Sequence, residues 1–328
     1  MDLYYLGLKR KTIQHNTFFK SAIVVSGGLE QNGDINFNNL YNYEVDYNLL
    51  SNFSVISQYY SKAIDYILSK NNNAKFMLYN QAAIEFMDSL DNVICYNDIE
   101  LIKNLNDKPT CRNLLKNEIK VLEYKYLYGN QISFNKVNKM FNCEFEKYVV
   151  QQPVGFAGVG TFLITKDNSK TIVKQLNPNI LYSVSGYIES ISVNNTFIIS
   201  NNHIHIFEGS QQLIVANKEL SYDGWDFDGY KNLNESIKAN VYNETTKIAK
   251  KLQSLGYRGI GGVDYIINND NVYFMEINPR FQASSEYLDK MLISLGFSSI
   301  FELNYFAFYN ESEFIKISKK LENYYNKR

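Results

Sequence analysis

The chain has 328 residues, 45% of them hydrophobic and 20% charged, which is long and apolar enough for the cores of two or three subdomains. A formal net charge of −1 does not suggest binding to nucleic acid or to an anionic membrane through bulk charge. The sequence contains no apolar run of membrane-spanning length. Its three cysteines form no CxxC pair, so we expect reduced, buried thiols and a cytoplasmic location.

The first 105 residues alternate strand-like and helix-like segments. Residues 21–27 (SAIVVSG) predict a strand that Gly27 and Gly28 turn into a loop. The patterns that follow predict a helix, a strand, a helix and a strand in residues 55–70, 74–80, 81–90 and 92–97. Such alternation implies parallel pairing, and we therefore expect an open α/β sheet.

A second unit begins near residue 106. Asp107 can cap a helix there, and Pro109 suits its first turn. Residues 147–164 (KYVVQQPVGFAGVGTFLI) predict a strand, a glycine-rich loop and a second strand, and residues 170–176 and 180–189 are also strand-like. Glycines in such a loop let backbone N–H groups approach a phosphate closely, although a plain hairpin turn is the other interpretation.

From about residue 186 the chain is rich in predicted strands, including residues 190–200 and 203–209. His203 and His205 alternate on one strand face; two histidines can bind a metal, but the sequence offers no evident third ligand. Residues 235–256 predict an amphipathic helix that Gly256 ends, and the tail is helical in pattern. The apolar stripe of that helix comprises Ile237, Val241, Ile248, Leu252 and Leu255.

Residues 261–281 (GGVDYIINNDNVYFMEINPRF) contain polar side chains inside two β-rich runs joined by the turn signal NNDN. A symmetric hairpin places Asp264 opposite Glu276, with Asn278 on the same face. Such oxygen ligands suit Mg²⁺ together with phosphates and water, whereas an ordinary polar sheet face is the other interpretation. Arg280, farther along this face, can stabilise negative charge beside a metal. The opposite face is expected to carry Val263, Met275 and Ile277 into the core.

The segment GYRGIGGVDYII…VYFMEINPRFQASS resembles the C-terminal signature of the ATP-grasp superfamily, with a likeness that extends from about Asn106 to Ser285. The resemblance implies an α/β fold (α+β in the C-terminal part) with a pre-ATP-grasp domain, a lid subdomain and a C-terminal subdomain. We place these parts in residues 1–105, 106–185 and 186–328. It further implies ATP and one or two Mg²⁺ ions, with Mn²⁺ as a substitute. The implied metal ligands are Asp264, Glu276 and Asn278, and the implied catalytic residues are Glu276 and Arg280.

The same resemblance implies which residues contact the nucleotide phosphates. Lys108 matches the first of two phosphate-binding lysines, and the glycine-rich loop matches a mobile lid. The position of the second lysine is occupied by Gln152, which brings no charge. Lys174, on a predicted strand, is a candidate to replace that charge. The loop glycines are Gly155, Gly158 and Gly160.

The segment LYSVSGYIESISVN resembles the hinge between lid and core. The resemblance implies that backbone groups around Tyr187 and Ile188 bind adenine, since an acidic residue common at this hinge is missing or displaced. Glu189 is a candidate for the ribose hydroxyls, and a surface acid at the end of a strand is the other interpretation.

The resemblance as a whole implies a ligase that joins a carboxylate, of an amino acid or peptide, to an amine through an acyl phosphate, releasing ADP and phosphate. A carboxylase-type or kinase-type enzyme of the same superfamily is one alternative. A nucleotide-binding pseudo-enzyme or scaffold is another, motivated by Gln152 and the altered hinge. The expected partners are a small-molecule or peptide substrate and a second copy of the chain in a homodimer.

Overall fold

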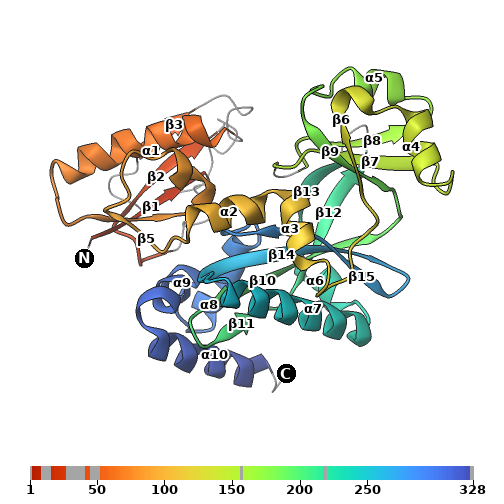
Figure 1. Ribbon diagram of the computed structural model, residues 1–328. Coiled ribbons are helices and arrows are strands. Elements are labelled where there is room, and N and C mark those ends of the chain that lie inside the picture. Colours follow the sequence, from red (N-terminus) through yellow and green to blue (C-terminus); the bar gives the residue numbers. More distant parts are fainter. Residues whose placement is uncertain are drawn as a thin grey trace.

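The structure is a computed structural model that describes residues 2–8, 16–26, 41–44, 52–155, 158–216 and 220–325. The predicted turn at Gly27 and Gly28 lies outside these residues. Within them the chain forms three β-sheets, called here the N-terminal sheet, the lid sheet and the core sheet (Figure 1). The N-terminal and lid sheets stand over opposite ends of the core sheet, with α2 (Ile99–Asn106) and α3 (Lys108–Leu115) crossing between them (Figure 1).

The N-terminal sheet is parallel, in the order β3-β2-β1-β4-β5, which confirms the predicted open α/β sheet. Helix α1 (Phe53–Leu68) starts at Asn52, whose side chain accepts a hydrogen bond from the backbone of Val55. Residues 81–90 were predicted as a helix and instead contain only a 3₁₀ turn, η3 (Gln81–Phe86). The strands are β1 (Leu3–Gly7), β2 (Ser21–Ser26), β3 (Tyr41–Glu44), β4 (Lys75–Leu78) and β5 (Val93–Ile94).

The lid sheet is antiparallel, in the order β6-β9-β7-β8. The strand prediction for residues 170–176 was wrong, because Ser169–Val173 form the short helix α5, in which Ile172 is buried. The strands are β6 (Lys125–Tyr128), β7 (Lys147–Gln151), β8 (Thr161–Thr165) and β9 (Leu181–Gly186). The helical elements are η4 (Gly129–Gln131), α4 (Phe134–Met140) and α5 (Ser169–Val173).

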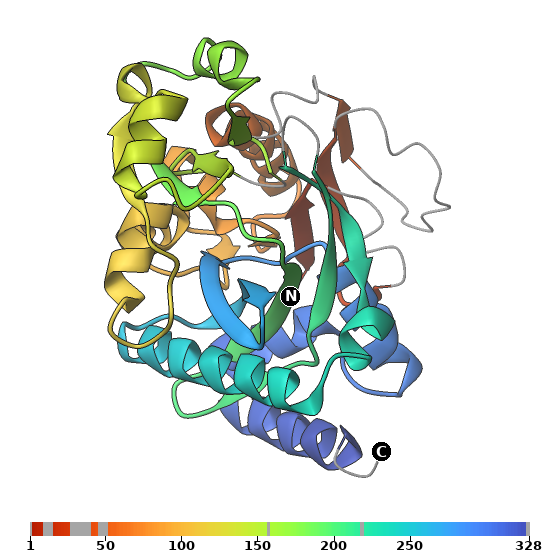
Figure 2. The same ribbon diagram turned by 90° about the vertical axis from the view of Figure 1, so that its right-hand side faces the viewer.

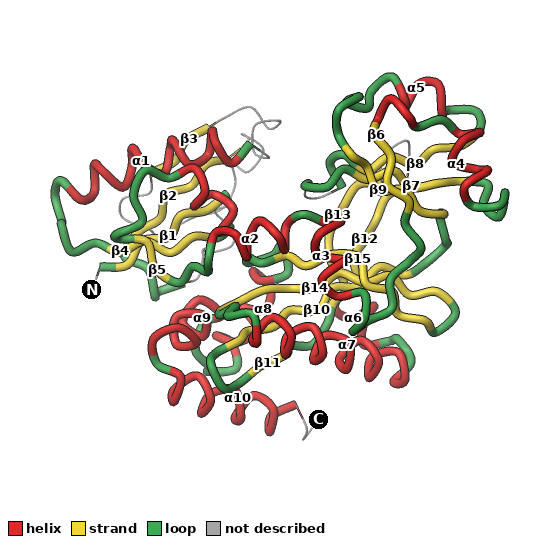
Figure 3. The backbone as a smooth tube through the Cα atoms, viewed as in Figure 1, coloured by secondary structure: helices red, strands yellow, loops and turns green. Residues whose placement is uncertain are grey.

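The core sheet is antiparallel, in the order β13-β12-β10-β14-β15, with β11 paired to β10. Its strands are β10 (Ile191–Ile199), β11 (Ile204–Ile206), β12 (Ser210–Ala216), β13 (Leu220–Asp226), β14 (Gly259–Asn268) and β15 (Asn271–Asn278). Helices α7 and α10 lie below the sheet in Figures 1 and 3. The helices are α6 (Phe227–Lys231), α7 (Glu235–Ser254), α8 (Ser285–Ser294), α9 (Ile300–Tyr309) and α10 (Glu311–Tyr325).

Helix α7 shows how far an apolar stripe predicts burial. Four of its five predicted stripe residues are buried, and the fifth, Leu255, is 39% exposed. The helix ends at Ser254, and Gly256 takes a left-handed backbone conformation (φ +89°). Leu255 therefore lies beyond the last helical residue, and its side chain does not continue the buried stripe.

The N-terminal sheet and the C-terminal helices share one hydrophobic core. Tyr5 of β1 and Phe19 both pack edge-on against Phe301 of α9. Figure 2, turned by 90°, shows the C-terminal helices grouped beneath the sheets. The lid sheet has its own smaller apolar cluster, and its strand β8 packs against β13 of the core sheet.

Of the helices that the structure describes, none has the length and apolar character needed to cross a bilayer. The three cysteines are free thiols. Cys95 and Cys111 are buried as expected, whereas Cys143 is exposed, which corrects the prediction for that residue. Cys143 follows Asn142 in a turn where both have positive φ, so its side chain leaves the lid surface rather than entering the lid core.

Candidate active site

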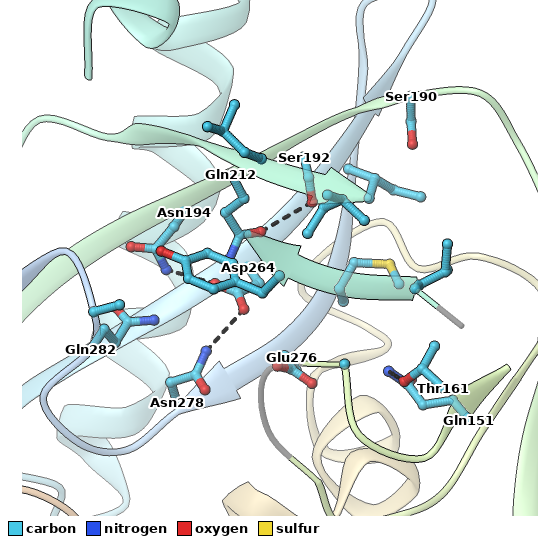
Figure 4. Close-up of a pocket in the computed structure, with 18 of the residues that line it drawn as sticks. Gln151, Thr161, Ser190, Ser192, Asn194, Gln212, Asp264, Glu276, Asn278 and Gln282 are labelled. Carbon is cyan, nitrogen blue, oxygen red and sulfur yellow. Dashed lines mark hydrogen bonds between the residues drawn. The ribbon is translucent and has the colours of Figure 1, made fainter. Parts of the chain in front are cut away.

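A cavity of about 790 Å³ lies between the lid sheet and the core sheet and reaches the N-terminal sheet at Tyr79 and Asn80. This volume is within the range of small-molecule and cofactor sites. Of the predicted site residues, the lining includes Gly158, Tyr187, Ile188, Asp264, Glu276, Asn278 and Arg280. Figure 4 shows the polar side chains of the core sheet gathered on one wall of this cavity.

The predicted hairpin is formed by β14 and β15. Asp264 lies directly opposite Glu276, as predicted, and Asn278 lies opposite Gly262. The hairpin is not symmetric as predicted, because the pairing nearer the turn differs by one residue from the predicted register. A β-bulge beside Asp264 shifts the register so that Tyr265 pairs with Phe274. Met275 is the extra residue on β15, and it lines the cavity instead of entering the core as predicted. The bulge thus turns both Met275 and Glu276 toward the cavity.

Asp264 is held by a set of neutral hydrogen-bond donors. Asn194 donates to Oδ1 at 2.6 Å and Asn278 donates to Oδ2 at 3.0 Å. Burial, followed by the nearby charge of Glu276, raises the pKa of Asp264 to about 6, against the opposing effect of the hydrogen bonds. The carboxylates of Asp264 and Glu276 lie opposite each other in the cavity and would attract a cation.

Glu276 is paired with Lys108, whose Nζ lies 3.0 Å from Oε2. Burial alone would raise the pKa of Glu276, but the charge and hydrogen bond of Lys108, with smaller contributions from Arg112 and Arg280, lower it. Lys108 is itself only 5% exposed, and its Nζ also donates to the carbonyl of Gly155 at 3.3 Å. One ammonium group therefore joins the hairpin carboxylate to the glycine-rich loop.

Arg280 lies at the end of the same hairpin. Its Nη2 donates to Asn278 Oδ1 at 2.8 Å, and its Nη1 donates to the carbonyl of Phe281 at 3.1 Å. Because Asn278 also donates to Asp264, both ends of its amide group are engaged. Asp264, Asn278 and Arg280 form a connected row along the cavity wall.

The glycine-rich loop closes against both the lid strand and β13. Gly158 and Gly160 have positive φ, +86° and +75°. A Cβ at Gly158 would come within 1.9 Å of the Leu220 carbonyl oxygen, so this approach requires glycine. Gln152 stabilises the loop through two hydrogen bonds. Its backbone N–H donates to Gly160 O at 3.0 Å, and its side chain donates to Val159 O at 3.4 Å.

Strand β7 presents Gln151, rather than Gln152, to the cavity. Tyr148 and Val150 point into the lid core, whereas Val149 and Gln151 alternate with them and line the cavity. Gln151 and Gln152 are adjacent in the sequence, and only the strand pairing shows which of the two faces the cavity.

The remaining predicted residues lie at different distances from the cavity. The backbone of Tyr187 is tied to Lys147 O at 2.9 Å, and Tyr187 and Ile188 both line the cavity. Glu189 is exposed, and its carbonyl accepts a hydrogen bond from Asn268 at 2.7 Å. Lys174 is exposed at the end of α5. Neither Glu189 nor Lys174 is among the lining residues, and their roles stay predictions.

Sequence reasoning missed Arg112, Gln151 and Asn194. Arg112 stands four residues after Lys108, so helical spacing places both on one face of α3. Asn194 and Asn195 are polar residues inside the apolar run of β10, and that pattern was a usable signal. No local pattern marked Gln151.

The described residues contain no group of three or more His, Cys, Asp or Glu side chains arranged to hold a metal ion. The cavity instead supplies two carboxylates and an amide oxygen, at Asp264, Glu276 and Asn278. This donor set suits Mg²⁺, which typically takes one or two carboxylates and completes its octahedron with phosphates and water. It is a poor set for Zn²⁺, which favours sulfur and imidazole ligands.

Comparison with known protein families gives one match that covers the site. The profile of the ATP-grasp domain matches residues 105–284, which include α3, the lid sheet and the hairpin.

Two curated proteins illustrate the sequence similarity. The tyramine–L-glutamate ligase of Methanocaldococcus jannaschii is 25% identical over 224 residues, which are 61% of this chain and 69% of that protein. The [butirosin acyl-carrier protein]–L-glutamate ligase of Niallia circulans is 22% identical over 191 residues, which are 56% of this chain and 45% of that protein.

Solved structures share the fold at low sequence identity. The D-alanine–D-alanine ligase of Bacillus anthracis has a TM-score of 0.57 at 13% identity, covering 98% of this chain and 99% of that one. The N5-carboxyaminoimidazole synthetase of Staphylococcus aureus, solved with ADP, has a TM-score of 0.59 at 16% identity, covering 93% and 76%. The L-amino acid ligase of Bacillus licheniformis has a TM-score of 0.57 at 10% identity, covering 88% and 70%.

Proposed function

We propose, from the premise that this chain belongs to the ATP-grasp family and is an ATP-dependent carboxylate–amine ligase, that its acid substrate is L-glutamate or a closely related amino acid. The names of the two curated relatives support this choice, because both proteins act on L-glutamate. The amine is a small molecule, a peptide or a carrier-bound group. A homodimer and a cytoplasmic location stay predictions.

One observation carries the proposed chemistry: Asp264 and Glu276 face each other across the hairpin inside the cavity, with Lys108 and Arg280 beside them. Asp264, Glu276 and Asn278 would hold Mg²⁺, which when bound offsets the negative charge of the ATP phosphates during phosphoryl transfer. A plain polar sheet face would not place two partly buried carboxylates opposite each other in one ligand-sized cavity.

The side chains of this protein have distinct tasks in the reaction. Backbone N–H groups of the glycine-rich loop can donate to phosphate oxygens, and Lys108 lies between that loop and Glu276. The substrate carboxylate attacks the γ-phosphorus, which yields an acyl phosphate and ADP. The amine then attacks the acyl carbon, loses a proton and expels inorganic phosphate. Arg280 can stabilise the oxyanion of this second step, and the lid keeps water from the acyl phosphate.

The assay uses the purified full chain with ATP, Mg²⁺, L-glutamate and a panel of amines that includes tyramine. We expect ADP, phosphate and a γ- or α-amide in equal amounts, only when acid and amine are both present. Hydroxylamine should trap the acyl phosphate as a hydroxamate. AMP in place of ADP would exclude the acyl-phosphate route, and bicarbonate-dependent ADP release without an amide would favour carboxylase-type chemistry. Nucleotide binding without turnover for every acid and amine would indicate a scaffold.

A further inference from the structure

We infer that Arg112 is a positioning residue that connects the lid sheet to the hairpin of β14 and β15. It also orients the side-chain amide of Gln151 toward the bound nucleotide. This inference rests on the proposed function only in taking the cavity as the nucleotide site. It concerns two residues that the sequence did not single out.

The guanidinium of Arg112 connects three strands from two sheets. Its Nη2 donates to Gln151 Oε1 of β7 at 2.7 Å and its Nη1 donates to Ser183 Oγ of β9 at 3.1 Å. Its Nε donates to the carbonyl of Met275 on β15 at 3.1 Å. Two contacts therefore hold the lid sheet, and the third holds the bulge residue next to Glu276.

Among the described residues, no carboxylate lies at hydrogen-bond distance from the buried charge of Arg112, although that charge interacts with Glu276 over a longer distance. Arg112 is 3% exposed, and these three acceptors are all neutral. The ring of Tyr124 lies under the guanidinium, 3.8 Å from ring centroid to Cζ, and offers only partial compensation. Burying such a cation is costly for stability alone. An anionic ligand in the adjoining cavity would be attracted by it.

Arg112 also decides the orientation of the Gln151 amide. Arginine has only donors, so the side-chain atom of Gln151 that faces it must be the carbonyl oxygen. The amide nitrogen then points to the other side, where one of its N–H groups donates to Thr161 Oγ1 at 3.5 Å at the cavity wall. Figure 4 shows Gln151 and Thr161 together, across the cavity from Asp264. The second N–H group is left to donate to an acceptor atom of the nucleotide.

The decisive variant is Gln151→Glu. Its carboxylate can form an ion pair with Arg112, so we expect thermal stability to be unchanged or higher. The substitution removes the N–H donors and adds negative charge at the cavity wall. We therefore expect the Kd for MgADP, measured by titration calorimetry, to rise at least about tenfold, as for a lost hydrogen bond to a charged partner. If Gln151 had a purely structural role, the Kd would rise only through the added negative charge, and the difference from the wild type would disappear at high salt.

A second variant, Arg112→Lys, keeps the charge but cannot serve three acceptors in different directions. We expect a higher KM for ATP with a smaller change in kcat, and a weaker Kd for MgADP. Lys116→Gln is the matched control, because it removes an exposed charge at the end of the same helix and should bind MgADP like the wild type.

Wild-type MgADP affinity in Gln151→Glu would overturn the inference, and that variant decides the matter even if Arg112→Lys does not fold. Nucleotide binding is measured without turnover. A wild-type protein that binds MgADP and makes no amide would therefore refute the ligase proposal while leaving this test valid.

Discussion

At the residue scale, the site depends on the ion pair between Lys108, which is buried, and Glu276, which is partly buried. Asp107 caps α3 by accepting a hydrogen bond from Thr110, which directs Lys108 from the first turn toward the hairpin. The ammonium of Lys108 then neutralises Glu276 and contacts the carbonyl of Gly155. A divalent cation at Glu276 would compete with this ion pair, so Lys108 is placed to move toward a phosphate oxygen when metal and nucleotide bind.

Glu276→Gln tests the metal role of this residue. The amide can still accept a hydrogen bond from Lys108, so the fold should persist, but it cannot supply a charged metal ligand. We expect kcat to fall by at least about 100-fold, comparable with the loss of one preorganised electrostatic contact. Mn²⁺ binding, followed by electron paramagnetic resonance with ADP present, should weaken as well.

The matched control for Glu276→Gln is Asp223→Asn, which removes an exposed carboxylate on β13, at the opposite edge of the core sheet. The control should retain both activity and Mn²⁺ binding. Wild-type Mn²⁺ affinity in Glu276→Gln would remove Glu276 from the metal site.

At the element scale, β11 and α10 meet at a pair of histidines with no role in the cavity. His205 is 2% exposed, packs edge-on against Phe207, and neither of its ring nitrogens has a hydrogen-bond partner within the part of the chain described. Glu322 of α10 lies 3.7 Å from His203 and 3.9 Å from His205. Helix α10 therefore lies over these histidines, and His205 is a core residue.

This burial predicts a pH dependence of stability. Burial, and then the charge of His203, lower the pKa of His205 from 6.5 to about 3. Between those values the unfolded chain binds the proton more readily, so the His205 contribution to stability is lost progressively as the pH falls from about 6.5 toward 3. Replacing His205 with Phe should reduce the loss between pH 7.5 and pH 4.5 by about 2 kcal/mol, measured by urea unfolding. Equal pH dependence in both proteins would contradict this explanation.

At the scale of the whole molecule, one face of the N-terminal sheet belongs to a core shared with the C-terminal helices, while its other face packs with α1 in a separate cluster. Phe301 of α9 packs against Tyr5 and Phe19 from the N-terminal part and against Phe281, which follows the hairpin of β14 and β15. The N-terminal sheet and the core sheet should therefore unfold together. The cavity then lies between the lid sheet, which is more loosely attached, and a part of the molecule that unfolds as one unit.

Phe301→Ala should destabilise the protein by about 3–5 kcal/mol, because it removes a fully buried aromatic ring from this shared core. Unfolding in urea should follow the same curve by far-UV circular dichroism and by fluorescence of Trp225, the only tryptophan. Phe86→Ala, at a side chain that is 44% exposed, is the control and should change stability by less than about 0.5 kcal/mol. Two separate transitions would show that the N-terminal sheet folds alone.

The sequence by itself determined the parallel N-terminal sheet, the position of the glycine-rich loop and the hairpin of β14 and β15. Each of these follows from local periodicity, turn residues and spacing, which act between neighbours in the chain. Predictions from the sequence were wrong where the periodic pattern is short or interrupted, as in α5 next to Lys174.

Only the tertiary structure decided that Met275 turns into the cavity, that Gln151 rather than Gln152 faces it, and that Arg112 joins lid to hairpin. A bulge depends on which residues the partner strand offers, and a buried guanidinium finds its acceptors on strands 39, 71 and 163 residues away in sequence. Such contacts form because packing brings distant polar groups together where none can be left unsatisfied, and no local pattern records that requirement.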